Sequence, residues 1–311
     1  MLYIQNLFRI TLLISVLITA SCEFDQFNPD GDEPTVVSGE TISEEELDAL
    51  RKDISAEGYS YSVGKTSLPK DAVRRLCGLK IPEGWEKNAS FLASDSKSLQ
   101  AVVLPSAYDL KKLGFMTSVK NQGDCGSCWA FATTGMFESV IKKNFSVTEN
   151  LSEQQLISCN SYGYSCDGGW FVPEIYKEGA VKESSFPYKQ ACVRCKTGCK
   201  KYYHAAAAKF LKADGIPSIT AIKNALYKYG AVAASVYVDE RFQYYKSGIF
   251  NGTAKGDINH AIIITGWDDN RQAWRIKNSW GSDWGESGYM WIAYNCQKIG
   301  YGACVITGVT K

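Results

Sequence analysis

The hydrophobic pattern changes along this chain of 311 residues, and the change limits the possible folds more than any other feature. Residues 128–143 contain no proline, and apolar residues recur there every three or four positions, at Trp129, Ala132, Met136 and Val140. This spacing predicts a helix with one buried face. Further helices are expected at 152–158, 170–177 and 222–229. Strands are expected at 231–238, 261–266, 273–277 and 288–293, where apolar residues alternate or run together. A helical half followed by a sheet half indicates an α+β fold.

The first 22 residues are typical of an export signal. Residues 10–20 form an apolar run that follows Arg9 and is too short to span a membrane. Small residues at 19–21 suit cleavage by a signal peptidase. Cys22 permits a second interpretation, in which it carries a lipid anchor of a bacterial envelope lipoprotein. We therefore expect an exported protein, located outside the cell, in a lysosome-like compartment, or on a bacterial envelope.

Residues 23–103 are predicted to be a linker followed by a segment that depends on the rest of the chain. Ser43 and Glu46 form a capping box, which predicts a helix that ends at Gly58. A second short helix is expected at 70–76. The segment has too few apolar residues to hold a core alone, so it should fold against the part that begins at Leu104.

Charge divides the chain at the same place. Residues 23–103 hold 16 acidic and 9 basic residues, whereas residues 104–311 hold 17 and 24. The two parts could attract each other, or their charges could simply be unrelated solvated surfaces. The total charge of +1 argues against nucleic acid as the partner.

The segment from Gln122 to Phe131 contains the most informative motif, Cys125-Gly-Ser-Cys128. By itself it permits a redox dithiol, half of a zinc site, or a catalytic thiol beside a structural one. A thiol at a helix N-terminus is stabilised as the thiolate in each case. The total of eleven cysteines favours an oxidising compartment with several disulfides.

Two distant residues favour the catalytic interpretation. His260 begins an apolar strand, where a lone histidine is more often a core residue, and Asn278 could be an ordinary loop amide. However, His260 follows Cys128 by 132 residues and Asn278 follows it by 150. This combination of motif and spacing is the one known from papain and the cathepsins.

The chain therefore resembles the papain-like cysteine peptidases over about residues 103–311. Further motifs support the resemblance: Cys166-Asp-Gly-Gly169, Phe186-Pro-Tyr188 and Asn278-Ser-Trp-Gly-Ser-Asp-Trp-Gly285. It implies a peptidase domain at 104–311 with a helical lobe (about 115–213), an antiparallel barrel-like β lobe (about 214–311) and a cleft between them. It implies no cofactor and no metal.

The resemblance also assigns roles. Cys128 would attack the scissile carbonyl, His260 would accept the thiol proton and later protonate the leaving amine, and Asn278 would orient the imidazole. Gln122 and the Cys128 amide would form the oxyanion hole. Trp280 would shield the His260–Asn278 hydrogen bond, although it could equally be a core residue.

Several positions match the substrate groove of the family. Gly168 and Gly169 would let a peptide backbone lie alongside as an added strand. The residues matching the pocket for the second side chain before the cleaved bond (P2) are Trp170, Phe171, Ser235, Ile258 and Val309. None is charged, so an apolar P2 residue is expected.

The prosegment at 23–103 is similar to that of cathepsin B. Leu76-Cys77-Gly78 follows a short helix, and Cys77 and Gly78 would block the cleft of a zymogen; alternatively, Cys77 is an incidental thiol. The loop that limits cathepsin B to chain ends is missing, because residues 187–209 are few and contain only His204. This departure predicts an endopeptidase acting on proteins or peptides and inhibited by its own prosegment.

The family pattern implies the disulfides Cys125–Cys166 and Cys159–Cys195, with Cys192–Cys199 and Cys296–Cys304 as further local pairs. A zinc site of Cys192, Cys195, Cys199 and His204 is an alternative. Two other functions compete with peptidase activity. One is a thiol–disulfide oxidoreductase, which leaves His260 and Asn278 without a role. The other is an inactive relative that binds peptides.

Overall fold

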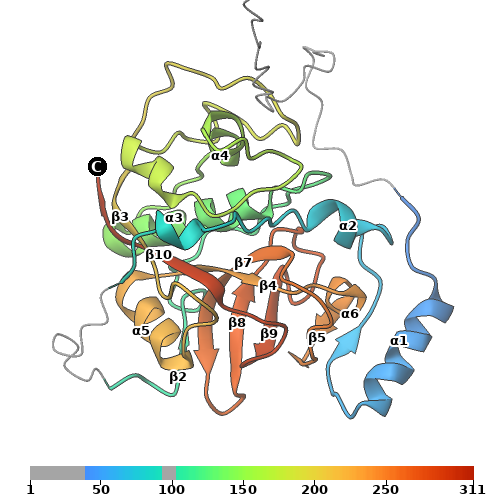
Figure 1. Cartoon of the computed structure of the whole chain (residues 1–311). Helices are drawn as coiled ribbons and strands as arrows, with labels where there is room; N and C mark the ends of the chain where they lie inside the picture. Colours follow the sequence, from blue (N-terminus) through green and yellow to red (C-terminus); the bar gives the residue numbers. More distant parts are fainter. Residues whose placement is uncertain (1–38, 93–102) are drawn as a thin grey trace, which may run out of the picture.

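A large sheet forms the lower part of the molecule in Figure 1, a computed structural model that describes residues 39–92 and 103–311. Within these ranges eight strands join in the order β3-β10-β4-β7-β8-β9-β6, with β2 paired to β7. All neighbours are antiparallel except β6 and β9. The strands are β2 (Ala107–Asp109), β3 (His204–Phe210), β4 (Val232–Val236), β6 (Ile249–Phe250), β7 (His260–Asp268), β8 (Ala273–Lys277), β9 (Tyr289–Ala293) and β10 (Tyr301–Thr310).

The long helix α3 lies above this sheet and contacts β7 (Figure 1). Its residues from Cys128 to Ile141 are all buried. Gly135 allows the close approach, because a Cβ there would collide with Cδ1 of Ile263. The helices are α1 (Glu44–Ala56), α2 (Ala72–Leu76), α3 (Cys128–Phe145), α4 (Glu153–Cys159), α5 (Ile219–Tyr229) and α6 (Glu240–Gln243), with 3-10 turns η1 (Trp85–Lys87) and η2 (Pro173–Glu178).

The α+β prediction is confirmed, and the differences have local causes. Residues 170–177 were expected to be an α-helix, but only a 3-10 turn forms, starting at Pro173. Strands β3 and β10 were not predicted. The alanine run at 205–208 favours a helix in isolation, and it becomes a strand by pairing with β10. Since β2 and β3 also join the sheet, the sheet extends beyond the predicted range of 214–311.

The prosegment folds against the domain, as expected. Ser43 and Glu46 make the predicted capping box, and α1 buries Leu47 and Ile54. Strand β1 (Ser62–Val63) then pairs with β5 (Tyr245–Ser247). The ring of Tyr61 lies 4.7 Å from that of Phe250. The buried side chains of the prosegment are thus part of the same core as those of the domain.

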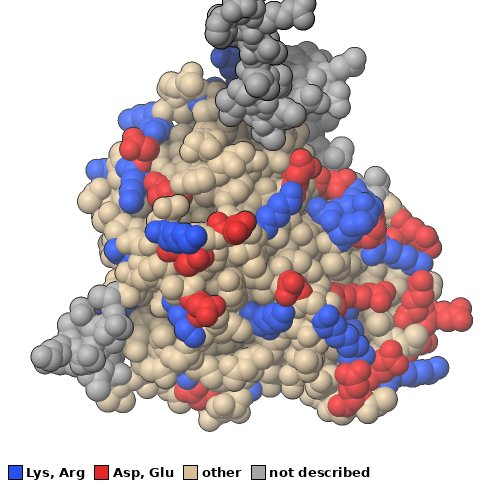
Figure 2. All heavy atoms as spheres, viewed as in Figure 1, with Lys and Arg blue, Asp and Glu red and all other residues tan. Residues whose placement is uncertain are grey.

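The charges of the prosegment are mostly neutralised within the prosegment itself. Acidic and basic side chains crowd together in the region of α1 in Figure 2, where Arg51 pairs with Glu44 and Asp48. Among the described residues, only two ion pairs join prosegment to domain, Arg75–Asp124 and Glu57–Arg241. One has the basic partner on the prosegment, so the expectation of an acidic segment bound to a basic domain is not confirmed.

Several predictions concern residues outside the described ranges. They are the signal peptide at 1–22, the lipid anchor at Cys22, the linker as far as residue 38, and the region around 100 where the prosegment would be cleaved. Within the described ranges, no helix has both the length and the apolar character needed to cross a membrane.

Candidate active site

The three residues predicted to form the catalytic triad come from three different elements. Cys128 is the first residue of α3, His260 is the first of β7, and Asn278 directly follows β8. His260 Nε2 lies 2.8 Å from Asn278 Oδ1. The Cys128 thiol lies near the backbone amide of Ala261, the residue after His260. The fold therefore brings together side chains that are 132 and 150 residues apart in the chain.

Trp280 packs against the imidazole of His260. The two ring centroids are 4.7 Å apart, and Trp280 is fully buried. Trp280 also packs against Phe242 and Trp284. The His260–Asn278 hydrogen bond therefore lies behind aromatic side chains, which exclude water from it.

Burial strongly affects both reactive groups. It raises the pKa of the Cys128 thiol to about 11, although nearby backbone amides, including those of Ala261 and Gly78, oppose the shift. Burial lowers the pKa of His260 to about 4, against the hydrogen bond to Asn278. Both shifts favour the neutral forms of the thiol and the imidazole.

Residues 76–78 of the prosegment contact the candidate site. Gln122 Nε2 donates to the carbonyl oxygen of Leu76 at 2.9 Å, and Ser279 Oγ donates to Gln122 Oε1 at 2.7 Å. The predicted oxyanion donor is thus held by Ser279 and already binds a peptide carbonyl. Cys77, next to Leu76, has a buried thiol whose pKa is raised by burial and by the nearby Cys128.

Residues 78–80 of the prosegment continue between Gly169 on one side and Asn259 on the other. Gly169 N donates to Gly78 O and Lys80 N donates to Gly169 O, both at 2.9 Å, while Leu79 N donates to Asn259 O at 3.0 Å. Leu79 is bridged to Gly169 in a parallel sense. The expected strand addition at Gly168 and Gly169 is therefore present, with the prosegment as the added strand. Gly78 has no room for a side chain, because a Cβ would collide with the carbonyl oxygen of Gly126.

The structure brings Ser235 and Trp170, two of the residues predicted for the P2 pocket, to the same end of β10. Ser235 Oγ donates to Tyr301 O at 2.5 Å, and a Cβ at Gly302 would meet the ring of Trp170. Val309 pairs instead with Ala205 on β3, beyond the end of β4. Val309 was therefore assigned wrongly. The predicted strands did not include β10, and its register with β4 determines which residue lies beside Ser235.

The structure adds an aromatic cluster that the sequence did not reveal. Trp85 of the prosegment packs on Phe210, Trp170 and Tyr301, with ring-centroid distances of 4.7, 5.4 and 6.4 Å. A lone tryptophan in a segment poor in apolar residues was the only available signal for this contact.

Two of the four predicted disulfides form, Cys125–Cys166 and Cys159–Cys195. The other two predicted pairs are wrong, since Cys192, Cys199, Cys296 and Cys304 are free thiols. Their surroundings differ: Cys296 Sγ lies 3.3 Å from Gly252 O, whereas Cys304 is fully buried in β10 beside Ala233 of β4.

The disulfides also decide between the alternatives for the motif. Cys125 is bonded to Cys166, so it does not form a dithiol with Cys128. Cys195 is bonded to Cys159, so it cannot ligate zinc together with Cys192 and Cys199. His204 lies apart from the candidate site and approaches the carbonyl of Lys177 through Nδ1 at 3.1 Å. Ser127, at the start of α3, contacts Tyr188 through its hydroxyl and makes no capping hydrogen bond.

Comparison with known proteins agrees with this geometry. The family model "Papain family cysteine protease" matches residues 104–309. The chain belongs to the papain family of cysteine proteases. It is a cysteine-type endopeptidase with the α+β fold of that family.

Relatives match the prosegment region as well as the domain. Ananain of Ananas comosus is 32% identical over 263 residues, covering 80% of this chain and 73% of ananain. Cathepsin K of Mus musculus is 29% identical and covers 92% of this chain and 88% of its own. The solved structure of the digestive procathepsin L2 proteinase from Tenebrio molitor larval midgut is 28% identical, has a TM-score of 0.75, and covers 85% of this chain and 90% of its own.

Proposed function

We propose that Cys128, His260 and Asn278 hydrolyse peptide bonds and that this chain is the zymogen. Cys128 attacks the scissile carbonyl, and its proton passes to His260, which Asn278 orients. Gln122 and the Cys128 amide stabilise the oxyanion, and His260 then protonates the leaving amine. Trp280 keeps water from the His260–Asn278 hydrogen bond.

One observation carries this proposal. Gln122, the predicted oxyanion donor, already binds the carbonyl of Leu76, while the amide of Gly78 lies beside the thiol. A peptide backbone thus occupies the position that a substrate would take. Cys77 and Gly78 act as the inhibitory segment, and the Leu76-Cys77-Gly78 sequence is the feature shared with the cathepsin B prosegment. Removing residues before about 104 would expose the thiol and the imidazole to each other and to substrate.

The substrate preference follows from the lining of the groove. Trp170, Phe171 and Ile258 are buried and apolar, and Tyr301 takes the place assigned to Val309. Tyr301 is not acidic, and none of the other residues expected in the pocket is charged. We therefore propose a preference for apolar P2 residues over arginine. A peptide library that differs only in P2 tests it, and faster cleavage of the peptide with arginine at P2 than of the peptide with leucine at P2 would contradict it.

We also propose that the protein is exported. The apolar run at 10–20 and the two disulfides support this, since disulfides persist in oxidising compartments. The lipid anchor at Cys22 is a separate proposal, tested by metabolic labelling with a radioactive fatty acid and by the variant Cys22→Ser.

Active-site labelling tests the catalytic assignment. Residues 23–311 are incubated at pH 5 and pH 7 and treated with an epoxysuccinyl peptide that alkylates papain-like thiols. Mass spectrometry then locates the label and the new N-terminus. We expect labelling of Cys128 only after loss of roughly 80 N-terminal residues, the length of the predicted prosegment. Labelling of the intact chain would contradict inhibition by the prosegment, and no labelling of Cys128 in any form would contradict the catalytic role.

A further inference from the structure

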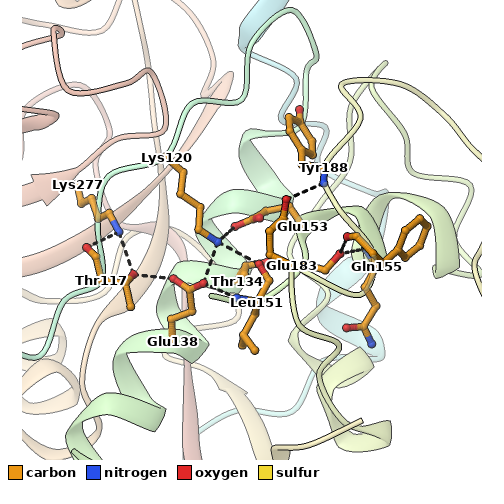
Figure 3. Close-up of polar contacts among 12 residues, drawn as sticks. Thr117, Lys120, Thr134, Glu138, Leu151, Glu153, Gln155, Glu183, Tyr188 and Lys277 are labelled. Carbon is orange, nitrogen blue, oxygen red and sulfur yellow. Dashed lines mark hydrogen bonds and ion pairs between the residues drawn. The ribbon is translucent and has the colours of Figure 1, made fainter. Parts of the chain in front are cut away.

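Figure 3 shows a cluster of buried charged side chains around Lys120. Lys120 Nζ donates to Glu138 Oε1 at 2.8 Å and to Glu153 Oε1 at 2.7 Å. The side chain of Glu138 is fully buried and that of Glu153 is 2% exposed. Glu183 and Lys142 are the other charged groups whose fields reach the cluster. Burying a carboxylate costs free energy unless its charge is paired. Here Lys120 pairs with both carboxylates.

Hydrogen bonds connect the cluster to Lys277, the residue that precedes Asn278 in the chain. Thr117 Oγ1 donates to Glu138 Oε2 at 2.6 Å, and Lys277 Nζ donates to Thr117 O at 3.1 Å (Figure 3). Lys277 is the last residue of β8 and directly precedes Asn278. The cluster therefore joins helices α3 and α4 to the end of the strand that carries Asn278.

A small cavity lies between the cluster and Asn278. Its volume is about 20 Å³, and its walls include Glu138, Glu153, Lys277 and Asn278. A cavity of this size with polar walls can hold one water molecule.

The polar groups around the cavity are incompletely paired. Asn278 Oδ1 pairs with His260, whereas Asn278 Nδ2 is a buried donor with no partner among the described residues. Glu153 Oε1 accepts from Lys120, while no hydrogen bond within the described ranges uses Oε2. A buried donor normally finds a partner, and a water can act as acceptor and donor at once.

We propose that a water bound in this cavity joins Asn278 Nδ2 to the carboxylates of Glu138 and Glu153. The water accepts from Nδ2 and donates to carboxylate oxygens. Glu138 and Glu153 thereby act as positioning residues, which hold the Asn278 amide so that its oxygen stays on His260. The inference rests on the proposed catalytic role of Asn278.

The variant Glu153→Gln tests the coupling in the processed enzyme. It keeps the size of the side chain and removes the negative charge that would hold the water. We expect kcat to fall about tenfold with KM changed less than about twofold, because substrate binding does not involve this site. The pH profile of Cys128 alkylation should also move, since a less well-oriented imidazole stabilises the thiolate less.

A matched control separates positioning from stability. Gln155 lies on the same helix and is also buried, but its side chain bonds to Gly179 and Val181 instead. Gln155→Ala should lower the unfolding temperature without moving kcat or the alkylation profile. If Glu153→Gln changes activity no more than Gln155→Ala does, the proposal is wrong.

The variant Ala132→Val tests the water without altering a charge, because Ala132 also lines the cavity. Two added methyl groups would displace the water, and the same loss of kcat is expected. Normal kcat in a folded Ala132→Val enzyme would overturn the proposal.

A crystal structure of the processed wild-type enzyme with ordered waters gives a test that does not depend on any variant folding. We expect one water within hydrogen-bond distance of Asn278 Nδ2, and a dry cavity would overturn the proposal. Wild-type labelling of Cys128 is measured in parallel. Its failure would contradict the proposed function, whereas successful labelling with unaffected variants would contradict only the coupling.

Discussion

Burial affects two polar sites of this molecule differently: the candidate active site at Cys128 and His260, and the cluster of Lys120, Glu138 and Glu153. At the catalytic site, burial moves the pKa values of Cys128 and His260 towards neutral forms. In the cluster, burial also opposes the charge on Lys120, but the carboxylates of Glu153 and Glu138 outweigh it and raise the Lys120 pKa. The difference is the presence of fixed opposite charges. Lys120 therefore favours its charged form, although burial raises the pKa of its partner Glu153 to about 7. Cys128 and His260 lack such a fixed opposite charge, and burial favours their neutral forms.

The largest effect is expected from breaking the buried ion pairs of the Lys120 cluster. Glu138→Ala removes the partner of Lys120, Thr117 and the amide of Leu151. Truncating one member of a buried ion pair costs roughly 3–5 kcal/mol, because the remaining groups are left unpaired. Denaturant unfolding measures this loss, with the exposed Glu178→Ala as control. A loss no larger than that of the control would show that the cluster does not stabilise the fold.

Gly78→Ala should displace the prosegment from Cys128 and leave the Lys120 cluster intact. The added methyl group would collide with the backbone of Gly126, so the strand at 76–80 could not stay in place. We expect unprocessed chain to be alkylated at Cys128 about a hundredfold faster, since a loss of roughly 3 kcal/mol in prosegment binding corresponds to that ratio. Gly252→Ala, where a Cβ meets no atom within 4 Å, is the control. Unchanged alkylation would mean that Gly78 does not hold the prosegment over the thiol.

Acid should open the zymogen through His260. Its pKa is about 4 in the closed form, compared with 6.5 for an unburied histidine. Between these values the closed form binds fewer protons than an open form, so its stability is complete above pH 6.5 and decreases as the pH falls towards 4. The fraction of open chain should rise by up to about tenfold per pH unit, and the rate of self-processing should follow it.

The effect of salt on the rate of processing distinguishes opening through protonation of His260 from opening through loss of surface ion pairs. The buried imidazole is poorly screened, whereas the exposed ion pairs between prosegment and domain are screened at high ionic strength. Processing should therefore depend on pH in the same way at low and high salt. Processing that is insensitive to pH over this range would contradict the role of His260.

The smallest effect is expected from an exposed ion pair. Arg241 donates to Glu57 through two nitrogens, at 2.9 and 2.7 Å, and Arg241 holds the pKa of Glu57 below its usual value. Because the carboxylate of Glu57 is exposed, Arg241→Gln should change the processing rate by about twofold or less. An effect as large as that of Gly78→Ala would mean that surface charge, not the cleft strand, retains the prosegment.

The sequence by itself determined the chemistry of the site. A thiol at a helix start, a histidine at a strand start and an asparagine after a strand are local features, and their spacing is shared with a known family. The capping box of α1 was likewise predictable, because it depends on residue types in a fixed order. The two disulfides that form were implied by the resemblance to the family.

Only the tertiary structure determined the burial and the contacts of those residues. The Leu76 carbonyl at Gln122 and the Gly78 amide beside Cys128 come from the prosegment, and no periodicity in residues 76–80 revealed these contacts. The error at Val309 has the same origin, since the register between β10 and β4 is set by long-range pairing. The link from Glu153 to the neighbourhood of Asn278 also required the packed lobes, because burial and hydrogen bonding between distant segments exist only after folding.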